Sequence, residues 1–203
     1  MVFSTIVLII IWFYILHILS KNKLTAFYYM LGSFGFFIIG LTFFFKPLTK
    51  VLSFITLVTL DLISKVFNCF EVFIDYNIIF INYKDIAISL YMNYECSGLI
   101  EILVLFSAII FYPLFTNKQK IFNLIMGSIW TCMSNIIRLL FIIFYICTNG
   151  NSSYYFAHSY LGRIIFYLLT IIMYFYMFSL TQISKQKIGR FKYKGNKDNK
   201  TEG

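Results

Sequence analysis

Long apolar runs separated by short polar stretches dominate this chain, and they predict helices that cross a membrane. A helix needs about 20 predominantly apolar residues to cross the hydrocarbon core of a bilayer. A shorter run, 51–60, ends in Asp61 and forms either a short span or a helix at the membrane interface. We therefore predict an all-α polytopic membrane protein with about six transmembrane helices, with five as the alternative. The other five runs cover 2–19, 26–45, 99–115, 121–146 and 156–180.

Between residues 66 and 93 the pattern changes, because polar side chains interrupt the apolar residues every few positions. The β-branched and aromatic segment 79–81 and the alternating segment 86–92 are separated by Asn82-Tyr83-Lys84-Asp85. This arrangement predicts a short β-hairpin. An open sheet edge is not stable in lipid. We therefore place the hairpin in a short extracytoplasmic segment outside the bilayer core.

Charge is unevenly distributed and indicates how the chain is oriented. Of the 203 residues, 60% are hydrophobic and 12% charged, and the formal net charge is +9. Seven of the seventeen basic residues lie between Lys185 and Lys200. A basic segment after a final apolar run indicates a cytoplasmic end and an anchor at anionic lipid, and argues against nucleic acid as the partner. We predict one membrane-embedded domain over 1–180 and a disordered, basic cytoplasmic tail over 181–203.

The run 121–146 carries a polar stripe that ends in an arginine. Its members recur at helical spacing, whereas the opposite face is apolar. A charged side chain inside a membrane faces the bundle interior and is usually functional. We therefore expect Arg138 to face the interior; its alternative role is a structural ion pair with Glu101 or Asp75. The stripe consists of Gly127, Ser128, Thr131, Ser134, Asn135 and Arg138.

A nucleophile candidate stands just before the run 99–115, in Glu95-Cys96-Ser97-Gly98. Ser97 and Gly98 predict a turn into the helix, with Ser97 as a cap. A helix N-terminus and a nearby cation both favour the thiolate of Cys96, which is the reactive form. The other cysteines have no C-x-x-C spacing, so we expect no metal site and no cofactor. We interpret Cys69, Cys132 and Cys147 as packing residues.

His158 begins the last apolar run, and the orientation places it on the same extracytoplasmic side as Cys96 and Arg138. Gly162 follows one helical turn later and leaves room for a partner. Arg163 is expected to point to another face and to pair with a carboxylate. A thiol, an imidazole and a guanidinium together can perform acyl transfer: Cys96 attacks a carbonyl, His158 moves the proton, and Arg138 stabilises the oxyanion.

These motifs resemble the exosortase/archaeosortase family. The resemblance covers about residues 75–180, and its marks are Glu95-Cys96-Ser97-Gly98 with Glu101, then Asn135-Ile136-Ile137-Arg138, then His158. It implies a membrane cysteine transpeptidase whose catalytic residues are Cys96, Arg138 and His158. It also implies, as partner, a membrane-anchored exported protein with a C-terminal sorting signal. The supporting residues are then Glu95, Ser97, Gly98, Glu101 and Asn135.

Two other interpretations remain open. In the first, the protein is a non-enzymatic membrane scaffold or transporter whose Asn135, Arg138 and Glu101 form a polar pathway, and Cys96 has no function. In the second, Cys69 and Cys147 form a structural disulfide. The sequence is compatible with each of these two interpretations as well as with the cysteine transpeptidase.

Overall fold

The computed structural model describes residues 2–67, 69–83, 86–92, 94–150 and 154–179 of the chain, most of them helical. Between α2 and α3 lie two 3₁₀ turns, η1 (Ile74–Tyr76) and η2 (Tyr94–Cys96). The last helix is composite: α5 (Tyr154–Phe156), the π-helical η4 (Ala157–Leu161), α6 (Gly162–Tyr174) and the π-helical η5 (Phe175–Ser179). The other helices are α1 (Val2–Lys21), α2 (Thr25–Ser64), α3 (Leu99–Phe111) and α4 (Asn117–Asn149).

Three helices are long and apolar enough to cross a membrane: α2, α4 and the composite helix Tyr154–Ser179. Two shorter apolar helical stretches accompany them, Ile6–Lys21 and Leu99–Phe111. These features are compatible with a membrane protein. The prediction of six spans is not confirmed, because the runs 26–45 and 51–60 form parts of the single 40-residue helix α2.

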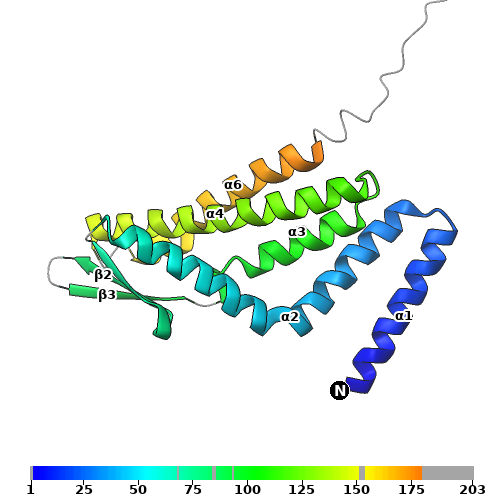
Figure 1. Cartoon of the computed structure of the whole chain (residues 1–203), viewed down its shortest axis with the longest axis horizontal. Coiled ribbons are helices and arrows are strands. Elements are labelled where there is room, and N and C mark those ends of the chain that lie inside the picture. Colours follow the sequence, from blue (N-terminus) through cyan, green and yellow to red (C-terminus); the bar gives the residue numbers. More distant parts are fainter. Residues whose placement is uncertain (1, 68, 84–85, 93, 151–153, 180–203) are drawn as a thin grey trace, which may run out of the picture.

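The helix α2 bends in its middle, as Figure 1 shows, and divides into two arms. Pro47 lies inside the helix. Proline lacks the backbone N–H and its ring crowds the preceding turn, so it bends a helix that it does not end. The first arm packs against α1 and α3, and the second arm reaches the sheet. The predicted run 26–45 stops just before Lys46-Pro47, but the helix continues through these residues with a bend.

A three-stranded antiparallel sheet corrects the all-α prediction. Strands β2 (Ile78–Tyr83) and β3 (Ile86–Tyr91) form the predicted hairpin, with Ile79 opposite Leu90 and Ile81 opposite Ile88. Sequence reasoning missed β1 (Phe70–Phe73), which pairs with β2 and forms one edge of the sheet, while β3 forms the other edge. The centre of the hairpin turn, at residues 84–85, and the tail 181–203 lie outside the described residues.

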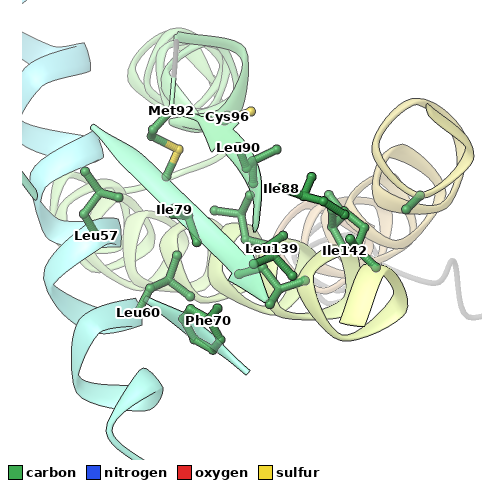
Figure 2. Packing of buried hydrophobic residues seen from close by; sticks show 14 residues of the cluster. Leu57, Leu60, Phe70, Ile79, Ile88, Leu90, Met92, Cys96, Leu139 and Ile142 are labelled. Carbon is green, nitrogen blue, oxygen red and sulfur yellow. The ribbon is translucent and has the colours of Figure 1, made fainter. Parts of the chain in front are cut away.

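The sheet packs between the second arm of α2 and the C-terminal part of α4, as Figure 2 shows. Leu57 and Leu60 of α2 are fully buried on one side. On the other side α4 contributes the buried residues that follow Arg138: Leu139, Ile142, Ile143 and Ile146. One face of the predicted span 121–146 is therefore packed against the sheet over its last third, whereas Phe141 on another face is 53% exposed. This places Arg138 where the sheet-packed part of α4 begins.

The polar stripe of α4 faces the interior, as predicted. Thr131, Ser134, Asn135 and Arg138 are buried, whereas Met133 on the opposite face is 55% exposed. The helix begins with a capping box in which Thr116 and Gln119 satisfy each other's backbone N–H groups. The capping box stabilises a first helical turn made of polar residues. As a result, α4 starts at Asn117, four residues before the apolar run.

The composite helix approaches α4 closely at Gly162. A Cβ atom built there lies 2.6 Å from Ile142 Cδ1, so the space that we expected Gly162 to leave is occupied by α4 itself. We predict that Gly162→Ala lowers the free energy of unfolding by about 1–3 kcal/mol, as overpacking of a core does. Thermal unfolding of the purified protein measures the change.

The second-site variant Ile142→Val removes the clashing Cδ1 atom and serves as the control. It costs about 0.5–1.5 kcal/mol alone, but the double variant is expected to be more stable than the sum of the two single effects. Additive losses in this cycle would contradict close contact at this point.

Candidate active site

A cavity of about 170 Å³ lies where the start of α3, the middle of α4 and the composite helix meet. All three predicted catalytic residues line it: Cys96, Arg138 and His158. Chain segments that are distant in sequence therefore contribute to one site. The rest of the lining consists of Ile100, Glu101, Ile142, Arg163, Phe166 and Tyr167.

The Cys96 thiol belongs to the turn η2, and Cys96 is only 2% exposed. Its side chain is part of the buried cluster formed with the sheet, and Figure 2 shows it close to Leu90 and Met92 of that cluster. The Asn135 side-chain Nδ2 donates a hydrogen bond to the Cys96 carbonyl oxygen at 2.8 Å. Asn135, the first residue of the motif that ends at Arg138, thus holds the backbone of Cys96 against α4.

Ser97 and Gly98 form the turn into α3, as the sequence predicts, but the N-cap residue of α3 is Gly98 and not Ser97. Gly98 has φ +74°, a left-handed conformation that glycine adopts without a steric penalty. The Ser97 hydroxyl accepts a hydrogen bond from the Leu99 N–H at 3.3 Å and donates one to the Tyr94 carbonyl at 2.8 Å. The thiol consequently lies at the N-terminal end of a 13-residue helix, where the helix dipole favours a negative charge.

Arg138 reaches the cavity one helical turn after Asn135 and is 8% exposed. Its guanidinium carbon lies 5.2 Å from the centre of the Phe166 ring, so the cation rests on an aromatic face. Glu101 lies in the same cavity, as the structural alternative for Arg138 expects. Asp75, the other carboxylate of that alternative, lies in η1 and is not among the described residues that line the cavity.

His158 lies in the π-helical segment η4, and its ring stacks on Tyr154 with 5.9 Å between ring centres. A π-helical turn has i→i+5 hydrogen bonds, and here the Gly162 N–H donates to the Ala157 carbonyl. In such a turn, residues i and i+5 therefore lie on nearly the same side of the helix. This explains why Arg163 lines the cavity with His158, whereas we predicted that it points to a different face.

Sequence reasoning missed Arg163, Tyr167 and Phe166 as parts of this site. These residues do not belong to any short motif. The π-helical turn at η4 also cannot be recognised from the spacing of hydrophobic residues in the sequence. The Glu95 side chain, which we predicted as supporting, lies outside the described part of the structure. Glu101 lines the cavity directly, while Ser97, Gly98 and Asn135 act on the backbone around Cys96.

The other three cysteines lie elsewhere. Cys132 is partly buried beside the cluster that includes Leu99 and Leu103. Cys69 and Cys147 are free thiols that contact each other: Cys147 Sγ donates to the Cys69 carbonyl oxygen at 3.4 Å. Among the described residues, no group of three His, Cys, Asp or Glu side chains is arranged to hold a metal ion.

Comparisons of the chain with protein-family models, with curated proteins and with solved structures find no match. What the site does must therefore be inferred from the chemistry of its residues and from the motifs they form.

Proposed function

We propose that this protein is a membrane-embedded cysteine transpeptidase or protease that cleaves the C-terminal sorting region of exported proteins. The observation that carries the proposal is the single cavity lined by Cys96, Arg138 and His158. The resemblance of their motifs to the exosortase/archaeosortase family agrees with this chemistry. The transporter alternative gives no reason for a thiol to line the cavity beside the guanidinium.

In the proposed reaction, the Cys96 thiolate attacks the carbonyl carbon of the scissile amide and forms a tetrahedral intermediate. Arg138 donates hydrogen bonds to the oxyanion in a buried site, where such bonds are worth more than in water. The C–N bond then breaks as protonated His158 gives its proton to the leaving amine. The product of this half-reaction is a thioester on Cys96 and a free C-terminal fragment.

The second half-reaction returns the enzyme to its starting state. Water or an acceptor amine attacks the thioester, and neutral His158 takes the proton from that nucleophile. The C–S bond breaks and the Cys96 thiolate leaves. Attack by water is hydrolysis and attack by an amine is transpeptidation, so the same residues serve both outcomes.

We propose that the active site faces the outside and that the C-terminus is cytoplasmic. The basic residues between Lys185 and Lys200 favour the cytoplasmic side. The composite helix crosses once before this segment, so its start with His158 lies on the opposite side. A substrate with a membrane helix would then present the residues just outside the bilayer to Cys96. Such alignment lowers the entropic part of the barrier.

Detection of the thioester tests the proposal. Cells that express the full chain are lysed in acid, and the peptide that contains Cys96 is examined by mass spectrometry. We expect an added acyl group on this peptide that neutral hydroxylamine removes. The peptide that contains Cys132, from the same digest, is the internal control and carries no such group. An unmodified Cys96 in cells that mature the substrate would contradict a covalent mechanism.

A further inference from the structure

A second cavity, of about 410 Å³, lies between the bend of α2 and the region that leads to Cys96. One face of α2 supplies four polar residues at spacings of three, one and three: Lys46, Thr49, Lys50 and Ser53. Residues at these intervals lie on one side of a helix. The remaining lining residues are Phe45, Asn77, Tyr91, Met92 and Tyr94.

Lys46 and Lys50 bring two positive charges to this cavity. Lys46 and Lys50 are one helical turn apart on its wall, and both are exposed. None of the described residues that line the cavity is Asp or Glu. Among the described residues, an ion pair joins Lys65 and Asp61, and neither lysine of the cavity forms one. Among the described residues, no carboxylate in the cavity balances these two positive charges.

Ser53 supplies a second and independent observation. It is 5% exposed, and its hydroxyl has no hydrogen-bond partner within the described part of the chain. Thr49 and Thr56, its neighbours on the same helix, both donate their hydroxyls to carbonyls one turn earlier. A buried hydroxyl that neither bonds its own helix nor another residue is unusual in a folded protein. It is a donor available to a ligand that enters this cavity.

The surroundings of the cavity are those of a membrane interface. Phe43 and Phe44, which directly precede the lining residue Phe45 on α2, are 55% and 59% exposed, so apolar side chains are exposed on the helix next to the cavity. On the other side, Tyr91 and Tyr94 are exposed tyrosines of the kind that gather at headgroup level. Lysines beside such a boundary keep their stems on apolar surface and extend their ammonium groups to the headgroups.

We propose that this cavity binds the phosphate of an anionic phospholipid headgroup. Two ammonium groups and the Ser53 hydroxyl supply donors for the phosphate oxygens, and the exposed phenylalanines lie where the acyl chains extend. Free inorganic phosphate offers the same oxygens without the chains, so the experiment separates the two sources. The proposal is independent of the reaction proposed for Cys96.

Binding of defined lipids to the purified full chain tests this site. The probes are phosphatidylglycerol, phosphatidylcholine with the same acyl chains, and inorganic phosphate; the readouts are bound lipid by native mass spectrometry and the thermal midpoint. We expect phosphatidylglycerol to bind and to raise the midpoint, with phosphatidylcholine and inorganic phosphate much weaker. Lys46→Gln/Lys50→Gln should weaken phosphatidylglycerol binding about thirtyfold, since each lysine near a lipid surface contributes about fivefold.

The control variant Lys21→Gln/Lys118→Gln removes the same charge from exposed positions elsewhere and should leave the affinity unchanged. Ser53→Ala keeps both lysines and should still weaken phosphatidylglycerol binding. This variant therefore tests the site if the double lysine variant does not fold. Equal binding of the two lipids, or an equal loss in the control variant, overturns the proposal. Stabilisation by inorganic phosphate alone, to the same extent, overturns the assignment to lipid.

Discussion

Cys96→Ala is expected to abolish processing of the exported substrate, with a loss of about 10⁴-fold or more. Removal of the nucleophile leaves only the contribution of substrate binding and oxyanion stabilisation. The measurement is the rate at which the substrate's C-terminal region is released in membranes that contain equal amounts of enzyme. The transporter alternative makes the opposite prediction, because it assigns no function to this thiol.

The control for this variant is Cys132→Ala. Cys132 is a partly buried thiol that packs near α3, and it does not line the cavity that contains Cys96. It should retain the rate of the parent protein. Because Cys96 is packed in the core with the sheet, thermal unfolding of both variants shows whether the fold survives. Continued processing by folded Cys96→Ala protein would reject the proposed reaction.

Arg138→Lys is expected to lower the rate of the chemical step by about 10²–10³-fold, the usual loss when one oxyanion donor is removed. Lysine keeps the positive charge but lacks the planar fork of donors and the flat cation that rests on Phe166. The substitution therefore separates geometry from charge. Single-turnover release of the substrate fragment measures it, because product release does not then mask the chemical step.

The structural alternative for Arg138 predicts a different result. If the guanidinium only balances Glu101, then Arg138→Lys should preserve the rate, and Arg138→Gln should mainly lower stability. Both variants are therefore compared by thermal unfolding and by rate. A full rate in the lysine variant would contradict a role for Arg138 in the oxyanion site.

Local patterns predicted the parts of the fold that depend on local physics. The polar stripe of α4 could be identified because a buried polar face needs residues at helical spacing. The hairpin β2–β3 could be identified because alternation and a polar turn coincide. In contrast, β1 has only four residues, Phe70 to Phe73, and its pairing with β2 is decided by contacts that no short segment contains.

The candidate site was partly predictable for a similar reason. Cys96 and Arg138 stand in short motifs, and the order of the apolar runs predicted that both lie on the same side of the membrane as His158. Arg163 could not be identified, because the π-helical turn at η4 shifts the register by one residue without any mark in the composition. The continuous helix α2 was also hidden, since charges and proline at Lys46-Pro47 indicate a loop unless the neighbouring helices support a bend.

The shared burial of Cys96 with the strands has a consequence for biogenesis. The side chain of Cys96 packs with β2, β3 and α4 in one hydrophobic cluster, so the position of the sulfur depends on the formation of the sheet. Under the proposed reaction, a newly inserted chain whose strands are still unfolded has no assembled nucleophile. The reactivity of this thiol toward a labelling reagent is then expected to change when the sheet forms.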